Sequence, residues 1–544
     1  MKKRRCPSRA QSRLSMQTSQ ISSLISALRH DLHSFVDDQG SIRQHCNSRG
    51  LESQLMLVLL RRMHTLPEVQ RSLARFLSRY KQRQSLNELE RRLVMPPGDD
   101  ATCASPVEHF TAERKQWMFS TYFALIHGMP YLTKDQIVKL EYHHQASWVC
   151  LTLCAIKIIN AYGANEPQLI SDQDRHFLLD QLTHGSAIPV WEGHLSAHLL
   201  SLLALQTFAP AHPLLMSGTR VILAWRNCDG GLPFITQMTI YLTAFAGVAL
   251  STSGKRSQKM RGMADYLAAE QAPDGAWPYS EHVTQTDIDS TCLALECLQR
   301  VDPVRHALSI QRGQDYLAGM ANLDGGFPTY HRNHPSEATM TANVIIALAP
   351  MGRKYADLLR SALAFLAAVQ HADGTFERSW SLSATFAIAR VISAVHHAAR
   401  FASPDLAENV RSKSMAYLLR AQNPDGGWGQ VSGQRSDVIS TAHALSALSY
   451  LDNTQALRRA VRYLQRRSGK HARFQALPDQ AAPRPIPYQF PVLAQIFALN
   501  ALGDAAKAVI CASSHPPAGA NGRSLPHGRD TAACSQSPRE CRVP

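Results

Sequence analysis

Residues 422–430 read QNPDGGWGQ, and related segments occur four more times along the chain. The other copies are NCDGGLPF (227–234), QAPDGAWPY (271–279), NLDGGFPTY (322–330) and QHADGTFERSW (370–380). An Asp-Gly pair favours the end of a helix, because glycine readily adopts the positive φ that such a turn needs. A helical segment precedes most copies and an alanine-rich apolar helix follows each, so the repeat is helix, turn, helix.

The helix after each turn is apolar on nearly all sides, which predicts that it is buried on several sides. Pairs of one amphipathic and one apolar helix stack into a solenoid or close into a double ring, with the apolar helices inside. A degenerate copy at 184–205 brings the number of pairs to six, enough to close a ring. The sequence therefore predicts an all-α fold, an (α/α) toroid of helix-pair repeats.

The chain has 544 residues, of which 45% are hydrophobic and 18% charged, a globular composition. Its formal net charge of +15 favours phosphate-bearing ligands, nucleic acid or an anionic membrane surface. The basic residues are dispersed and no nucleic-acid-reading motif is present, so no nucleic-acid partner is expected. A basic N-terminus without an apolar signal segment predicts a cytoplasmic protein, with peripheral contact to a membrane as the alternative.

The repeats align on the Ser or Thr that begins each apolar helix: Ser196, Thr243, Thr291, Thr341, Thr385 and Thr441. The residues four positions earlier all suit a helix cap or first turn: Glu192, Thr239, Asp287, Glu337, Ser381 and Asp437. Asp287 is therefore expected to be a structural cap. Two positions before the aligned residue stand His194, Tyr241, Asp289, Thr339, Ser383 and Ile439. Asp289 is the one carboxylate in that set, and capping does not explain it.

A carboxyl group at position 289 would face the central cavity from the start of an inner helix. Burial raises its pKa, whereas the helix dipole and nearby donors lower it. If burial dominates, Asp289 is a protonated acid that can protonate a carbon–carbon double bond, with aromatic faces stabilising the cation. The aromatic residues expected around this acid are Tyr241, Phe245, Trp380 and Phe386. The aromatic residues that recur after the Asp-Gly turn are expected to pack between repeats: Trp277, Phe327, Phe376 and Trp428.

The repeated Asp-Gly-aromatic segments resemble the QW motifs of triterpene and class II terpene cyclases, over about residues 180–505. The stretch TDIDSTCLAL (286–295) resembles the DxDD motif of that family. The resemblance implies that Asp289 is the Brønsted acid and that Asp287 supports it. Ser290 departs from the motif: it can donate a hydrogen bond to Asp289 but cannot supply a second carboxylate.

The resemblance also implies two domains of the βγ type. We expect a basic disordered tail over residues 1–30, a γ-like helical domain over 31–250, a β-like toroid with the DxDS acid motif over 251–505, and a disordered tail over 506–544. The break near 250 is placed at the polar segment SGKRSQK.

The expected function is protonation-initiated cyclisation of a linear prenyl diphosphate, because the chain resembles bacterial prenyl diphosphate cyclases in length. The net charge of +15 fits a diphosphate, and Mg²⁺ is the expected cofactor, with its ligands unassigned. The head-group cations are expected on the loops before the inner helices: Arg332, Arg378 and Arg435. No DDxxD run is present, so the diphosphate should survive the reaction.

His443 and Asn343 share a face of the inner helices and are candidates to accept or relay a proton at the end of the reaction. His334 is a candidate to orient Asp289. One alternative function is a squalene-type cyclase. A second is a protein-prenyltransferase-like toroid, disfavoured because no Asp-x-Cys zinc motif occurs. A third is a non-catalytic toroid. The partner is expected to be a small isoprenoid, and the oligomeric state stays open.

Overall fold

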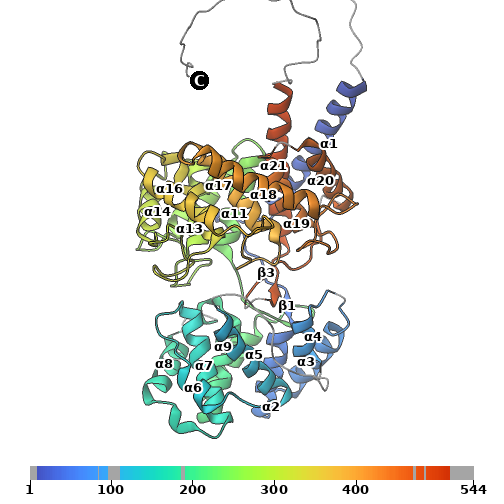
Figure 1. Ribbon diagram of the computed structural model, residues 1–544. Coiled ribbons are helices and arrows are strands. Elements are labelled where there is room, and N and C mark those ends of the chain that lie inside the picture. Colours follow the sequence, from blue (N-terminus) through green and yellow to red (C-terminus); the bar gives the residue numbers. More distant parts are fainter. Residues whose placement is uncertain are drawn as a thin grey trace, which may run out of the picture.

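A computed structural model describes residues 9–83, 85–95, 111–184, 190–451, 453–469, 473–482 and 485–514. The segment PPGDDATCASP (96–106), whose sequence predicts a loop between helices, lies outside these residues, and so does the end of the chain from residue 515. The described chain is almost wholly helical and forms two bodies, with the short strands β1 and β3 at their junction (Figure 1). Within the described residues, no helix is long and apolar enough to cross a membrane.

One body is the predicted toroid. Its inner ring, within the described residues, consists of six helices in this order: α11 (Thr239–Ser253), α13 (Ile288–Val301), α15 (Ala338–Leu348), α17 (Ala384–His397), α19 (Val438–Leu448) and α21 (Val492–Ser514). Each packs on the next, and α21 packs on α11, which closes the ring. The outer helices are α1 (Arg9–Ser34), α12 (Gln258–Ala269), α14 (Ala307–Gly319), α16 (Ala356–Ala368), α18 (Pro404–Ala421) and α20 (Thr454–Arg467). Short 3₁₀ turns follow α15 and α17 at Ala349–Met351 and Ala399–Phe401.

The Asp-Gly turns have the geometry that the sequence predicts. Gly374 has a φ of +92°, and a Cβ atom there would lie 2.1 Å from the carbonyl oxygen of Lys413 on the next outer helix. The aromatic residues after these turns are buried as expected: Trp277, Phe327, Phe376 and Trp428. Each of the four turns that precede these aromatic residues therefore ends an outer helix and inserts an aromatic side chain between neighbouring repeats.

The other body contains the remaining helices: α2 (Gly50–Arg62), α3 (Pro67–Tyr80), α4 (Glu88–Val94), α5 (Ala112–His127), α6 (Lys134–Lys139), α7 (Ser147–Gly163), α8 (Asp172–His184), α9 (Leu195–Phe208) and α10 (Pro213–Leu223). Two 3₁₀ turns lie at Pro167–Leu169 and Trp191–Gly193. Strand β1 (Ser48–Arg49) pairs antiparallel with β2 (Leu232–Pro233), where the chain enters and leaves this domain. Strands β3 (Gln480–Ala481) and β4 (Pro487–Tyr488) form a second small antiparallel pair.

The two hydrophobic cores divide the chain differently from the expected boundaries. The toroid core takes residues from 21–46 and 234–505, whereas the first-domain core takes residues from 51–232 together with Ile486. The expected break near 250 lies inside α11, whose buried residues belong to the toroid core. The first domain is thus inserted into the toroid, after α1.

Both expected tails overlap helices of the toroid. Helix α1 covers residues 9–34, with Leu28 and Leu32 fully buried, and α21 continues to residue 514. The sixth helix pair of the ring is α1 with α21, instead of the degenerate copy at 184–205. Helix α9 of that copy is as apolar as predicted, but it is buried against α7 and α2 in the first domain.

Candidate active site

A cavity with an empty volume of about 820 Å³ lies where the first domain meets the toroid. Trp148 and His194 contribute to its wall from the first domain, and Tyr241 and Phe386 contribute from inner helices. Three carboxyl groups line it as well: Asp287, Asp289 and Asp479. We call this cavity the acid chamber. It combines acidic groups with aromatic faces, as the sequence predicts for the surroundings of Asp289.

Asp289 lies in the first turn of α13 and faces the acid chamber. Its Oδ1 atom accepts a hydrogen bond of 2.7 Å from Asn343 Nδ2 on α15. Burial raises the pKa of Asp289 to about 6, although Arg390 and the Asn343 amide lower it. A carboxyl group with this pKa is partly protonated near neutral pH, which is the state that a general acid needs.

Asp287 is the structural cap that the repeat alignment predicts. Its Oδ1 atom accepts from the Ser290 backbone N–H at 2.7 Å, and its Oδ2 atom accepts from Ser290 Oγ at 2.9 Å. The prediction that Ser290 donates to Asp289 is therefore wrong: Ser290 is the third residue of α13, where its hydroxyl reaches the cap. Burial raises the pKa of Asp287 to about 7, and the negative charge of Asp289 adds to that rise.

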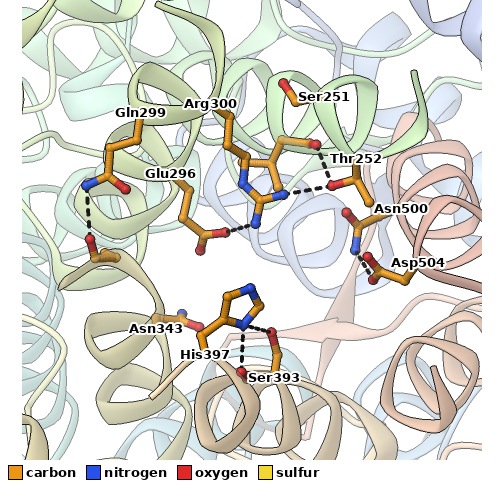
Figure 2. A network of polar contacts seen from close by, with 12 residues as sticks. Ser251, Thr252, Glu296, Gln299, Arg300, Asn343, Ser393, His397, Asn500 and Asp504 are labelled. Atoms are coloured by element: carbon orange, nitrogen blue, oxygen red, sulfur yellow. Dashed lines mark hydrogen bonds and ion pairs between the residues drawn. The ribbon is translucent and has the colours of Figure 1, made fainter. Parts of the chain in front are cut away.

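A chain of hydrogen-bonded polar side chains extends from Asp289 into the interior of the ring. Asn343 Oδ1 accepts from Arg390 Nε at 2.5 Å, and Arg390 Nη2 donates to Glu296 Oε1 at 2.6 Å. Glu296 also pairs with Arg300, which donates to Thr252; Figure 2 shows this end of the network. Because Arg390 occupies the amide oxygen of Asn343, the amide nitrogen is directed at the acid. Asn343 is thus a hydrogen-bond donor to Asp289, and its expected role as a proton acceptor is wrong.

Arg390 and Glu296 were not among the residues expected at the site. A signal for both was present, because each is a charged residue flanked by apolar residues near the middle of an inner helix. Burying one such charge alone is unfavourable, so opposite charges on two inner helices of one ring indicate an ion pair. In the structure this pair holds the amide that contacts Asp289.

The aromatic residues expected around the acid lie in two layers. Three line the acid chamber: Tyr241, Trp380 and Phe386. Phe245 instead packs behind the wall, with its ring 5.0 Å from that of Phe497. His443 contacts Phe386 and Phe497 at ring distances of 4.9 and 4.5 Å, and neither it nor Phe245 is part of the lining. Burial lowers the pKa of His443 to about 3, so its imidazole is neutral.

A second cavity, with an empty volume of about 830 Å³, adjoins the acid chamber. Three aromatic side chains line both cavities and form the partition between them: Trp148, Tyr330 and Trp380. Arg114 and Lys115 of α5 and His334 of the toroid line the second cavity, which we call the basic chamber. His334 lies there and does not line the acid chamber, so the structure does not place it to orient Asp289.

The head-group cations predicted on the toroid loops lie elsewhere. Arg332 and Arg435 are exposed, and Arg378 donates to the carbonyl oxygen of Leu382. None of the three lines either chamber. The cations at the cavity come instead from α5 of the first domain, which the repeat pattern does not connect to the toroid.

The expected Mg²⁺ has no ready protein site in the described residues. Within them, no three His, Cys, Asp or Glu side chains are grouped as metal ligands. Glu337, the carboxylate of the basic chamber, accepts hydrogen bonds from Thr329 and from Trp380 Nε1. A single carboxylate does not supply the set of oxygen ligands that Mg²⁺ needs, so the residues of this chamber do not fit an Mg²⁺ site built by the protein alone.

Comparisons with known proteins agree with this arrangement. Residues 333–506 match the family model of the squalene-hopene cyclase C-terminal domain, and residues 108–377 match that of the prenyltransferase alpha-alpha toroid domain. The chain is 37% identical over 495 residues to a drimenyl diphosphate synthase of Streptantibioticus cattleyicolor, covering 86% of this chain and 92% of that protein. The chain belongs to the class II terpene cyclases.

A second relative of this cyclase, the drimenyl diphosphate synthase of Streptomyces showdoensis, is 37% identical over 406 residues, or 73% of this chain and 74% of that protein. Among solved structures, ent-copalyl diphosphate synthase from Streptomyces platensis has the same fold, with a TM-score of 0.55 at 15% identity over 90% of this chain and 99% of that one. The protein is thus a class II cyclase of prenyl diphosphates, and its partner is a small isoprenoid substrate. These matches disfavour the non-catalytic and protein-prenyltransferase-like alternatives.

Proposed function

We propose that this cyclase converts farnesyl diphosphate, a linear C15 substrate, into a bicyclic diphosphate of the drimenyl type. The two relatives named drimenyl diphosphate synthases support the product class. The observation that carries the proposal is the position of Asp289, a carboxyl group with a raised pKa that faces an aromatic cavity next to a basic one.

In the proposed reaction, Asp289 supplies the first proton. Its Oδ1 atom is bonded to Asn343, so Oδ2 carries the proton. The proton adds to the terminal double bond, and the electron pairs of the next double bonds close the rings in turn. The faces of Tyr241, Phe386 and Trp380 stabilise the migrating positive charge, since a ring face attracts a cation. No carbon–oxygen bond breaks, so the diphosphate is retained.

The basic chamber is the proposed site for the diphosphate. Burial lowers the pKa of the Arg114 guanidinium, and a bound anion would compensate that desolvation. Arg114 also donates to Gln145 Oε1 at 2.9 Å, which fixes its direction. With the head group there, the hydrocarbon tail extends past the partition toward Asp289. If Mg²⁺ takes part, diphosphate oxygens and water would supply most of its ligands.

The test is a substrate panel of farnesyl diphosphate, geranylgeranyl diphosphate and squalene, each with Mg²⁺ and with EDTA. Products are dephosphorylated and analysed by gas chromatography with mass spectrometry. We expect a bicyclic C15 alcohol from farnesyl diphosphate, none from Asp289→Asn, and unchanged product from Asp504→Asn. Asp504 is a suitable control because it is buried, has its pKa raised to about 6, and lines neither chamber.

Two results would contradict the proposal: no cyclic product from farnesyl diphosphate, or full activity in Asp289→Asn. Arg114→Gln tests the head-group site separately. Loss of a charged hydrogen-bond donor costs about 1.5–3 kcal/mol, so KM for the diphosphate should rise about 10- to 150-fold. An unchanged KM would place the head group elsewhere.

A further inference from the structure

Asp479 is a third carboxyl group in the acid chamber, and the proposed reaction has not yet used it. It is 3% exposed and lies in the segment between α20 and α21, immediately before β3. Its backbone oxygen accepts from the Leu382 N–H at 2.8 Å, and the Ala481 N–H donates to the Trp380 carbonyl at 3.1 Å. These bonds hold the segment beside the residues that lead into α17.

Hydroxyl donors surround the Asp479 carboxylate. Ser381 Oγ donates to its Oδ2 atom at 2.6 Å, and Ser383 Oγ donates to its Oδ1 atom. Ser440 Oγ lies 2.7 Å from Ser383 Oγ and can donate to it, which completes a chain of hydroxyls directed at Asp479. Donors favour the ionised form of a carboxyl group, and each oxygen keeps a lone pair for a further proton.

The electrostatic surroundings of Asp479 leave it an accessible base. Burial is the largest influence on its pKa and raises it to about 6; the negative charge of Asp437 adds to the rise and the two serine hydroxyls oppose it. Arg378 is a nearby cation, although it lines neither chamber. Above pH 6 the carboxylate is therefore mostly ionised, yet more basic than an exposed Asp.

The repeats place this base at an informative position. Ser381 and Ser383 occupy, in the repeat of α17, the positions that Asp287 and Asp289 occupy in the repeat of α13. Asp479 thus brings a carboxylate to the corresponding position of another repeat. The ring order puts α15 between α13 and α17, so the acid and the base stand at separate points of one cavity.

Asp479 also lies on the side of the cavity toward the head group. Trp380 and Ala482 line both chambers, and Ala481 lines the basic chamber. Each ring closure moves the positive charge along the chain from the protonated end toward the head group. The final cation should therefore form near the partition, away from the acid that began the reaction.

We infer that Asp479 is the proton acceptor that ends the cyclisation, an inference that rests on the proposed function. A C–H bond next to the last cationic carbon breaks, its electron pair forms a carbon–carbon double bond, and the proton goes to a carboxylate oxygen of Asp479. The neutral Asp479 returns that proton to water when the product leaves. Neither His443 nor Asn343 lines the acid chamber, and the Asn343 amide is held between Arg390 and Asp289, so neither fills this role.

The experiment compares wild type with Asp479→Asn in single turnover with farnesyl diphosphate. General base groups contribute about 10²- to 10⁴-fold, so formation of the wild-type olefin should fall by about 100-fold or more. The substrate should still be consumed, because Asp289 is intact, and alcohols from water capture or isomeric olefins should replace the original product. Asp504→Asn is the matched control and should give the wild-type product.

Ser383→Ala provides a second variant that keeps the carboxylate. Losing one donor raises the pKa of Asp479, so the pH at which the wild-type olefin gains its full share of the products should move upward. An unchanged product mixture in both variants would overturn the inference, and so would a folded Asp479→Asn protein that consumes no substrate. If the wild-type protein forms no cyclic product, the proposed function itself is wrong. If the wild-type protein is active and both variants give the same products as wild type, the protein is a cyclase but Asp479 is not its base.

Discussion

Replacing Asn343 by Leu should move the pH dependence of the reaction. The Asn343 amide donates to Asp289 at 2.7 Å and lowers the pKa of that acid, which burial holds at about 6. A hydrogen bond to a charged group is worth about 1.5–3 kcal/mol, and one pKa unit corresponds to about 1.4 kcal/mol. The pKa of Asp289 should therefore rise by about one to two units in Asn343→Leu.

The direction of the pH shift follows from the protonation state in which Asp289 acts. A general acid works when protonated, so the wild-type rate is full below the pKa of Asp289 and falls tenfold per pH unit above it. In Asn343→Leu the falling limb should begin about one to two pH units higher, with a lower plateau because the acid is weaker. Single-turnover rates from pH 5 to 9 measure this limb.

Asn500→Leu is the matched control. Asn500 also donates an amide hydrogen bond to a carboxylate, Asp504, at 3.3 Å in the ring interior (Figure 2), but it does not contact Asp289. The pH at which the single-turnover rate of Asn500→Leu begins to fall should coincide with that of wild type. A limb that stays in place in Asn343→Leu, or moves to lower pH, would refute the assignment of Asp289 as the acid tuned by this amide.

Three further predictions concern stability. Arg390→Met leaves the buried Glu296 with Arg300 alone and should lower the free energy of unfolding, measured by urea titration, by about 3–5 kcal/mol. Adding Glu296→Gln should restore much of that loss. A double variant that recovers no stability would contradict the pairing. Burial raises the pKa of Glu296, but Arg390 and Arg300 lower it by more, so the net pKa is below that of an ordinary glutamate. The Glu296–Arg390 pair should therefore stabilise the protein at pH values above the ordinary glutamate pKa, and this stabilisation should be lost as the pH falls below it. Melting temperatures of wild type and the double variant should therefore converge in acid; a constant difference would contradict this. Gly374→Ala should cost more than about 1 kcal/mol, because φ is +92° and the added Cβ meets a backbone oxygen; an unchanged melting temperature would show that the turn can adapt.

The repeated turns were enough to predict the toroid, because Asp-Gly turns and apolar helices are local features. They also isolated Asp289, which is the only carboxylate among the residues two positions before the aligned Ser or Thr. The ring closure was not predictable in the same way. Helix α1 starts in a basic segment and α21 follows no Asp-Gly turn, so neither carries the repeat pattern.

The remaining site residues are brought together by tertiary contacts. Arg114 reaches the cavity from α5 because the inserted domain packs across the end of the ring, a contact with no periodic signature. Asp479 comes from an irregular segment, and its carboxylate binds Ser381, which the alignment assigned to a cap, and Ser383. Arg390 and Glu296 were visible as charges in apolar helices, but their connection to Asp289 depends on the rotation of three helices.

The closure of the ring by α1 and α21 has a consequence for biosynthesis. The ribosome makes α1 first, yet its principal partner is the last helix of the toroid. The inserted domain has its own core and can fold while the rest of the toroid is still being translated. The apolar side of α1 must stay uncovered throughout that time. Nascent chains should thus depend on chaperones until α21 leaves the exit tunnel, and truncation before α21 should yield aggregation-prone protein.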